Sequence, residues 1–353
     1  MFEKIRTKKL FFKANDLPKK IIGEYTLPCL TSSFQNQGLN YFVPRDGATI
    51  LKNVISIPSN SDVYRAYFQS NEFTILSDAY AIQWIYNGVK LSPSQYLFVV
   101  QCINKVTDLS IYSYKNKLGG WNVLKKKYIK LPIKNNKIDF EFMENFMQEL
   151  EAERMAELDA YLETNGLNDY ILTNKEQEIL EEFKNGKIYW GEFAFKNIFN
   201  KIVQGRRLKK EDQVPGKIPF VMAGTTNTGV VDYISNPVAS FPENSITIDI
   251  FGNTFYRGYN YGAGDDTGVY WNNETNYSKE GMLFFSASMA KSILGKFSYG
   301  NKLRSSQSLN FKMSLPIKNN QPDYKLMKTL VSAIQKSVIK DVVLYVEEKM
   351  KKY

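Results

Sequence analysis

Histidine is absent from this 353-residue chain, and its absence excludes several kinds of active site. Without histidine there is no Ser-His-Asp or Cys-His catalytic group and no histidine-ligated zinc. The two cysteines, Cys29 and Cys102, are too few for a four-thiolate metal site or a disulfide framework. We predict that both are buried, reduced thiols in a cytoplasmic protein, with no metal bound by this chain.

Long apolar runs and arginine are also scarce. No run approaches the roughly 18 apolar residues of a membrane span, and the N-terminal sequence MFEKIRTKKLFFKAND lacks the apolar stretch of a signal peptide. Only 8 of the 46 basic residues are arginine, although the formal net charge is +10. Such a charge is typical of a protein that binds a polyanion. The lysine-rich composition of proteins from AT-rich genomes explains it equally well.

The sequence repeats itself. The hexapeptide LPIKNN occurs at 131–136 and again at 315–320. Four further pairs of similar blocks follow one order in both halves: 27–43 with 218–234, 53–57 with 244–248, YRAY (64–67) with YRGY (256–259), and NKL at 116–118 and 301–303. The chain is therefore predicted to be a tandem duplication of roughly 1–165 and 185–353.

Each copy has two parts. The first shows short alternating runs such as SITIDIF (245–251) between turn residues, which predicts strands and short helices. The second is a long segment without glycine or proline, which predicts one long helix. We expect a mixed α/β (α+β) fold with pseudo-twofold symmetry, divided into residues 1–134, 135–184, 185–318 and 319–353.

The two predicted long helices differ in charge. Residues 139–163 carry nine acids and one arginine, whereas residues 324–353 carry seven lysines and three acids. Opposite charge and an apolar repeat of seven favour pairing of the helices as an antiparallel coiled-coil spacer; two solvated faces that never meet are the alternative. Asp323 is a predicted N-cap, and Asn165-Gly166 a predicted helix end. The apolar positions proposed for these partner-binding helices are Met147, Leu150, Leu158, Ile334, Val338 and Tyr345.

A spacer of this length matches a repeat of DNA. A 25-residue helix is about 37 Å long, and half-sites read by a dimer lie about 34–36 Å apart, one turn of B-DNA. The basic excess outside the two helices is +14, because together they contribute −4 to the total of +10. The two globular parts are therefore expected to bind the polyanion.

The runs at 205–234 and 241–261, followed by the NKL and LPI blocks and a long helix, resemble the specificity (S) subunits of type I restriction–modification systems and the similar recognition subunits of type IIB systems. The resemblance implies two target-recognition domains, 1–134 and 185–318, separated by antiparallel helices. It implies binding of a bipartite, asymmetric double-stranded DNA site. Partner DNA methyltransferase (modification) subunits and a restriction subunit would perform methylation and cleavage, using S-adenosylmethionine and Mg. In the first copy, the stretch that matches 188–216 is shortened to 1–24.

Two loops are the first candidates for DNA contact. The segment 224–229 combines hydroxyl and amide side chains with glycine, and 32–38 is its counterpart. Short polar side chains suit a close approach to phosphates or base edges; a plain turn, with Asn-x-Gly serving the backbone, is the alternative. The residues selected here are Ser32, Ser33, Gln35, Asn36, Thr225, Thr226 and Asn227. Because Asn36 and Asn227 are shared, a structural role is favoured for them.

Basic residues are the second candidates. Arg65 and Arg257 occupy the YRAY and YRGY blocks, and a residue common to both halves is expected to contact phosphate, with a structural ion pair as the alternative. Further phosphate contacts are predicted, against a solvated surface as the alternative, for Lys115, Lys117, Arg206, Arg207, Lys291, Lys302 and Arg304.

No catalytic motif is found. The chain has no Walker A sequence, no methyltransferase-like Asn-Pro-Pro-Tyr motif and no convincing glycine-rich cofactor loop. We therefore expect a non-catalytic DNA-recognition subunit that binds no cofactor itself. The alternatives are an interaction or anti-restriction module of the same fold that does not read sequence, and an enzyme with an unrecognised carboxylate site.

Overall fold

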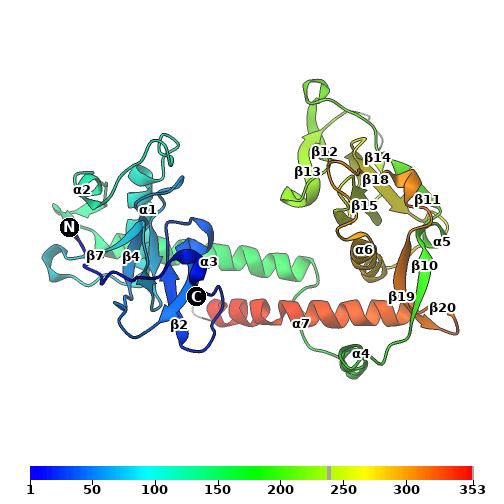
Figure 1. Ribbon diagram of the computed structural model, residues 1–353, viewed down its shortest axis with the longest axis horizontal. Helices are drawn as coiled ribbons and strands as arrows, with labels where there is room; N and C mark the ends of the chain where they lie inside the picture. The colour runs from blue at the N-terminus through cyan, green and yellow to red at the C-terminus, as the bar shows by residue number, and fades with distance from the viewer. Residues whose placement is uncertain (237–239, 352–353) are drawn as a thin grey trace. The chain divides into compact units, whose positions relative to one another are not determined.

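The computed structural model describes residues 1–236 and 240–351, which form two compact units (Figure 1). Residues 1–157 make up the first unit, and the second begins at Leu158. The boundary lies within the long helix α3 (Phe140–Thr164), which therefore begins in one unit and ends in the other.

The first unit is built from two small sheets, a helix against one of them, and a terminal hairpin. Its strands are β1 (Phe2–Lys4), β2 (Tyr25–Leu30), β3 (Leu39–Pro44), β4 (Val54–Pro58), β5 (Tyr67–Gln69), β6 (Thr74–Ile75), β7 (Ala79–Trp84), β8 (Ile133–Lys134) and β9 (Lys137–Ile138). Its helices, besides the start of α3, are α1 (Pro93–Thr107) and α2 (Trp121–Leu124), with short 3-10 helices η1 (Ala14–Asp16), η2 (Gln35–Gly38) and η3 (Tyr86–Gly88).

The second unit contains the remaining elements. Its strands are β10 (Trp190–Ala194), β11 (Lys201–Gln204), β12 (Pro215–Val221), β13 (Val230–Ile234), β14 (Ser240–Phe241), β15 (Ser245–Asp249), β16 (Thr254–Arg257), β17 (Tyr261–Ala263), β18 (Thr267–Trp271), β19 (Lys312–Lys318) and β20 (Gln321–Pro322). Its helices are α4 (Asn174–Lys184), α5 (Phe195–Ile198), α6 (Lys279–Ile293), α7 (Tyr324–Met350), η4 (Lys210–Asp212), η5 (Thr226–Gly229) and η6 (Ser305–Gln307).

The two units share one topology. The four-stranded sheet has the order β1-β7-β4-β5 in the first unit and β11-β18-β15-β16 in the second. In the other sheet, β2 pairs antiparallel with β3 and parallel with β6, just as β12 pairs with β13 and β17. Both α1 and α6 have 15 residues. The predicted duplication and the mixed α/β class are thus confirmed at the level of strand order.

The cores follow from the alternation seen in the sequence. Strands β4 and β15 are buried along their whole length, and α1 and α6 place apolar side chains in the clusters that contain these strands. Each helix begins at a serine whose hydroxyl accepts a backbone hydrogen bond: Ser92 from Gln95 and Ser278 from Gly281. The same helix therefore starts at the same point of each copy.

The LPIKNN repeat has a backbone explanation. In each copy the two asparagines have positive φ: 51° and 59° at Asn135 and Asn136, and 52° and 61° at Asn319 and Asn320. They form the two-residue turns that join β8 to β9 and β19 to β20. Asparagine is among the few residues that tolerate this conformation, which accounts for the identity of the block. In the described part of the first unit, no strand corresponds to β10, in line with its shortened start.

The start of α7 and the end of α3 lie where the sequence predicted them. Asp323 Oδ1 accepts the backbone N–H of Leu326 at 2.9 Å at the start of α7, and Gly166, with φ 62°, follows α3. Within the second unit, Leu158 and Leu162 at the end of α3 pack against Ile339, Val343 and Val346 of α7. The predicted helix pairing is confirmed for this part of α3.

The face of α7 that is buried differs in part from the predicted one. The seven-residue repeat ran through Met327, Val331, Ile334, Val338 and Tyr345. Met327 is buried, but Val338 is 73% exposed, and Ile334 and Tyr345 are also exposed. The buried positions are Met327, Leu330, Ala333, Val343 and Val346. Met327 packs in the core cluster that contains α6, Leu330 packs with Ile179 of α4, and Val343 and Val346 pack with Leu162 of α3.

A buried polar cluster joins α4 to α7. Glu176 is 6% exposed and accepts hydrogen bonds from Ser332 Oγ at 2.5 Å and from Lys336 Nζ at 3.2 Å. Lys336 Nζ also contacts Asp169 Oδ2 at 2.7 Å. Burial acts to raise the pKa of Glu176, but hydrogen bonds from Ser332, the Thr173 backbone and Lys336 outweigh it and lower the pKa to about 2.

Over residues 1–236 and 240–351, no helix is both long and apolar enough to cross a membrane.

Candidate nucleic-acid interface

The loop between β2 and β3 and the loop between β12 and β13 have the same backbone conformation. We call residues 31–38 the first hairpin loop and residues 222–229 the second. Asn36 and Asn227 both have φ 46° and ψ 39°, and the next residues, Gln37 and Thr228, have φ 53° and 52°. Two successive residues in the left-handed region are unfavourable unless glycine supplies them. The repetition of this conformation in two different sequences indicates that each unit holds it in place.

Glycine closes both loops. The Thr31 N–H donates to Gly38 O and the Met222 N–H donates to Gly229 O, each at 2.9 Å. A Cβ on Gly38 would lie 2.9 Å from Thr31 O, and one on Gly229 would lie 2.7 Å from Met222 O. Only glycine fits there, because the positive φ and the facing carbonyl both exclude a side chain.

The two shared asparagines serve the backbone, as the sequence favoured. Asn36 Nδ2 donates to Leu39 O at 2.6 Å, and Asn227 Nδ2 to Val230 O at 3.4 Å. These local bonds offset part of the cost of the left-handed conformation. A turn role and DNA contact are compatible here, because both asparagines remain exposed.

The other predicted loop residues lie at the surface. Gln35, Thr225 and Thr226 are exposed, while Ser32 and Ser33 are half-buried. Ser33 Oγ accepts the Gln35 N–H at 3.1 Å and so supports the turn from within. The hydroxyls and amide at the loop tips remain accessible to a ligand.

Arg257 is buried, which counts against the phosphate contact predicted from the sequence. It is 1% exposed, and its guanidinium donates to Thr247 Oγ1 at 3.0 Å, Tyr259 Oη at 3.1 Å and Thr228 O at 2.6 Å. A side chain enclosed in this way cannot reach a ligand at the surface. The motif that placed Arg257 in a site marks a buried strand end instead.

Arg65 is not the counterpart of Arg257, although the YRAY and YRGY blocks suggested it. Ser56 pairs with Tyr67, eleven positions later, whereas Thr247 pairs with Phe255, eight positions later. The connection is therefore three residues longer in the first unit, and matching the blocks by sequence misplaces the equivalence by four residues. Arg65 is exposed and its Nε donates to Asp108 Oδ2 at 2.7 Å. This is the ion-pair alternative, and the hydrogen bond to Asp108 raises the pKa of Arg65.

The structural counterpart of Arg257 is Gln69, which the sequence analysis missed. Val54 pairs with Gln69 as Ser245 pairs with Arg257, each at the same place in its sheet. Gln69 is 4% exposed. The sequence did contain evidence for this equivalence, because the NVISI and NSITI blocks align β4 with β15 and a paired strand follows each. The longer connection between β4 and β5 hid which residue of the second strand corresponds to Arg257.

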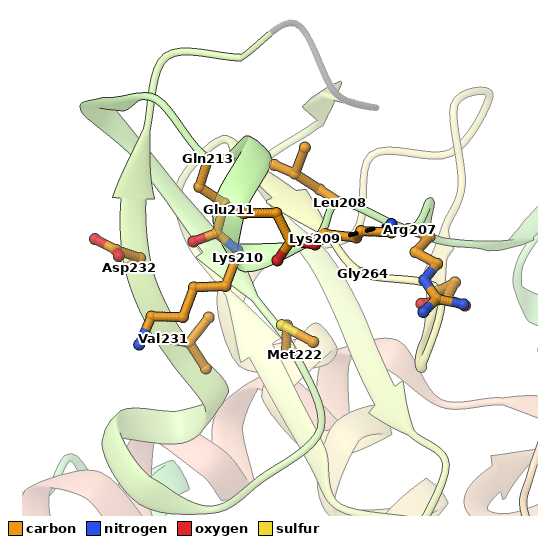
Figure 2. Close-up of a pocket in the computed structure, with 11 residues that line it drawn as sticks. Arg207, Leu208, Lys209, Lys210, Glu211, Gln213, Met222, Val231, Asp232 and Gly264 are labelled. Atoms are coloured by element: carbon orange, nitrogen blue, oxygen red, sulfur yellow. Dashed lines mark ion pairs between the residues drawn. The ribbon is translucent and has the colours of Figure 1, made fainter.

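A cleft of about 790 Å³ lies beside the second hairpin loop (Figure 2). The segment around η4 forms one wall, and β13, the turn at Gly264 and Met222 at the start of the second hairpin loop form the rest (Figure 2). Basic and acidic side chains both line it: Arg207, Lys209, Lys210, Glu211, Asp232 and Asp265. Lys209 Nζ and Glu211 Oε1 are 3.8 Å apart. The cleft therefore presents hydrogen-bond donors and acceptors together rather than a uniformly positive surface.

Arg304 is fixed next to this cleft. Its Nη1 donates to the backbone oxygen of Asp265 at 2.5 Å, and Gln204 Nε2 donates to the same oxygen at 3.0 Å. Gln204 Oε1 accepts the Ser305 N–H at 2.9 Å, which joins β11 to η6. Of the predicted basic residues, Arg207 and Arg304 thus lie at the same cleft, and Arg206, which precedes Arg207 in the chain, is exposed.

Two acidic residues that the sequence analysis left outside the site hold the second hairpin loop. Asp266 Oδ2 accepts the Ala223 N–H, and the buried Asp249 Oδ2 accepts the Gly224 N–H, both at 3.0 Å. Asp266 thus supports the backbone of the loop from the turn that precedes β18. The loop is thereby bound to two neighbouring elements.

The NKL blocks form a second repeated surface feature. Ser113 N donates to Asn116 O, and Ser298 N to Asn301 O, in the same turn. The lysine that follows lies over an exposed tyrosine ring in both units: Lys117 over Tyr114 at 4.7 Å and Lys302 over Tyr299 at 4.5 Å. Lys115 is exposed in the same turn.

Lys291 lies elsewhere. It lines an apolar groove of about 730 Å³ in the second unit, together with Trp190, Phe284, Val331 and Ile334. It is not among the residues that line the cleft beside the second hairpin loop. The structure therefore does not bring Lys291 together with the other predicted contacts. Of the remaining helix positions, Met147 and Leu150 lie on the part of α3 in the first unit.

Comparison with known proteins bears on this arrangement. Residues 187–343 match the family described as Type I restriction modification DNA specificity domain. Over 253 residues the chain is 26% identical to the Type II restriction enzyme BgcI specificity subunit S.BcgI of Heyndrickxia coagulans. The aligned residues make up 70% of this chain and 69% of that protein. Its fold is similar to that of the type I restriction–modification system S subunit from M. genitalium, with a TM-score of 0.60 and 15% identity over 99% of this chain and 90% of the other. At this identity the last comparison supports the fold alone. Residues 187–343 therefore carry a type I restriction modification DNA specificity domain, and the chain is similar to a specificity subunit of a restriction enzyme over 70% of its length.

Proposed function

We propose that the chain reads a bipartite, asymmetric double-stranded DNA sequence, one part with each unit, and directs partner subunits to it. The observation that carries the proposal is the pair of hairpin loops. Their backbones are the same, yet Phe34-Gln35 in one stand where Thr225-Thr226 stand in the other. One scaffold with different exposed side chains suits two modules that approach DNA alike and read different bases.

The cleft supports base reading in the second unit. Arginine and lysine donate to guanine O6 and N7, whereas acidic side chains accept from the cytosine amino group. Arg207, Lys209 and Lys210 supply donors, and Glu211 and Asp232 supply acceptors. A surface that only gripped phosphates would not need the carboxylates.

The repeated lysine–tyrosine turns suit the DNA backbone. They carry the same side chains in both units, and phosphates are the same whatever the sequence. Lys117 and Lys302 are therefore assigned to phosphate contact in this proposal, with Arg206 and Arg304 beside the cleft.

Partner subunits are assigned to the exposed apolar side of α7. Ile334, Val338 and Tyr345 are exposed there, and Ile334 also lines the apolar groove. In this proposal methyltransferase and restriction subunits bring S-adenosylmethionine and Mg, and the chain itself performs neither reaction, because the proteins it resembles are named as specificity subunits.

The DNA proposal is tested by selection from a random duplex library with the chain and its methyltransferase partner. One motif of two short defined parts separated by a gap is expected. Changing Thr225 and Thr226 to alanine should alter preference in one part only, and Gln35→Ala should alter the other, so each variant contains its own control. Equal affinity for unrelated duplexes would reject sequence reading and favour an interaction module of the same fold.

The partner proposal is tested by co-purification. Val338→Glu should abolish recovery of the methyltransferase subunit while the thermal unfolding midpoint stays unchanged, because the side chain is exposed. Lys340→Ala, two positions along the same helix and also exposed, is the control and should leave recovery intact. Full recovery with Val338→Glu would move the partner surface elsewhere.

A further inference from the structure

Besides the bonds from Asp249 and Asp266 at its start, the second hairpin loop is tied to the sheet behind it by the buried side chain of Arg257. Arg257 Nη2 donates to Thr228 O at 2.6 Å and Nη1 to Thr228 Oγ1 at 3.1 Å. Its Nε donates to Thr247 Oγ1 on the neighbouring strand. Thr228 is the second of the two left-handed residues. The side chain thus connects the least favourable point of the loop to the rigid part of the unit.

The first unit makes the same connection with a different residue. Gln69 Nε2 donates to Gln37 O at 3.3 Å and to Ser56 Oγ at 3.1 Å. Gln37 corresponds to Thr228 in the loop, and Ser56 corresponds to Thr247 in the strand register. Two unlike side chains therefore supply the same link at the same position of a duplicated fold.

The geometry explains why such a link is needed. A carbonyl that points inward must be paired, because an unsatisfied buried acceptor is costly. Two consecutive left-handed residues would relax if nothing held them. The loop tips carry no packing of their own, since Gln35, Asn36, Thr225 and Thr226 are exposed. The buried donor therefore decides whether the exposed side chains keep fixed directions.

The two links differ in charge. Arg257 is flanked by the rings of Phe255 at 5.3 Å and Tyr261 at 5.9 Å, and the groups to which its guanidinium donates are neutral. Within the described chain it belongs to no ion pair with a carboxylate. Gln69 is neutral. The positive charge of Arg257 is accompanied beneath the same loop by the carboxylates of Asp249 and Asp266, which accept the Gly224 and Ala223 N–H groups.

We propose that Gln69 and Arg257 are the positioning residues of the two hairpin loops. The inference rests on the proposed DNA-reading function. It assigns specificity to two side chains that lie beneath the loops and make no base contact.

The test compares Arg257→Gln with Arg257→Leu in the full chain. Glutamine is the residue that the first unit uses, so Arg257→Gln should keep the discrimination of the second half-site. Arg257→Leu should lose about tenfold or more of that discrimination. Gln69→Leu should have the same effect on the first half-site only. In each case the untouched half-site is the internal control.

Hydrogen exchange separates this inference from the function on which it rests. Amides of residues 222–229 should exchange about tenfold faster in Arg257→Leu and at the wild-type rate in Arg257→Gln, whether or not DNA is read. Unchanged exchange in Arg257→Leu, or equal loss of discrimination in both Arg257 variants, would overturn the inference. If Arg257→Leu does not fold, the Gln69→Leu and Arg257→Gln variants decide by the same readouts. Failure of the wild type to discriminate any duplex would reject the proposed function, and the exchange rates alone would then decide whether these side chains position the loops.

Discussion

Replacing Glu176 with glutamine should destabilise the second unit in a pH-dependent way. The carboxylate links α4 to α7 through Ser332 and Lys336, and its side chain is 8% exposed. Its pKa is lowered from 4.5 to about 2 in the folded chain. At about 1.4 kcal/mol per pKa unit, the folded state favours the charged form by about 3 kcal/mol. Glutamine keeps some of the hydrogen bonds, so a loss of about 2 kcal/mol at pH 7 is expected.

The direction of the pH dependence follows from the lowered pKa. A carboxylate whose pKa falls on folding contributes its full stabilisation above the unfolded value of 4.5, and this contribution is lost as the pH falls toward 2. Glutamine does not titrate. The stability difference between wild type and Glu176→Gln should therefore be constant from pH 7 to about pH 5.5 and shrink by about 1 kcal/mol at pH 4.

Thermal unfolding measured by circular dichroism over this pH range is a suitable assay. A loss of about 2 kcal/mol lowers the midpoint of a unit of this size by about 4–8 °C. Glu178→Gln is the matched control, because Glu178 lies on the same helix in an exposed ion pair with Lys175, which is expected to contribute less than about 1 kcal/mol. An unchanged midpoint for Glu176→Gln, or a difference that does not narrow in acid, would refute the reasoning.

Three further changes test the fold and its surfaces. Gly229→Ala should destabilise the second unit by about 2 kcal/mol or more in a thermal melt, because of the positive φ and the nearby Met222 carbonyl. Gly300→Ala is the control: a Cβ there meets nothing within 4 Å, so the same melt should show no change in stability. Leu162→Ala should cost about 2–4 kcal/mol in chemical denaturation through a cavity beside Val343, and a loss below about 0.5 kcal/mol would argue against the α3–α7 contact. Burial raises the pKa of Cys29 to about 12, so a thiol reagent at neutral pH should modify Cys29 only after unfolding, as mass spectrometry of the digested protein would show.

Much of the fold could be predicted from the sequence because the blocks that recur in both halves mark equivalent elements. LPIKNN marks a turn that asparagine alone among its neighbours tolerates, and Asp323 and Gly166 mark helix ends through hydrogen bonds that are local in the chain. Signals of this kind depend on a few adjacent residues. They can therefore be recognised in the sequence without knowledge of the tertiary structure.

The misplaced site residues depended on distant partners. Whether Arg257 faces solvent is decided by Thr228 and Thr247, which lie 29 and 10 residues away. The pairing of Gln69 with that position is concealed by a connection three residues longer. On α7, apolar side chains lie on several sides of the helix. The sequence could not tell which side is buried, because that depends on where residues 158–180 pack. The spacing of residues within one segment does not show which side chains distant parts of the chain will bury.

The shared conformation of the hairpin loops has a consequence for how target preference can change. The features that set the backbone are Gly38 and Gly229, the buried donors and the strand pairing, and they lie at the base of each loop or behind it. The tips can therefore exchange side chains at little cost to folding. Under the proposed DNA-reading function, a protein built on this plan would acquire a new target one unit at a time, while the other unit kept its old preference.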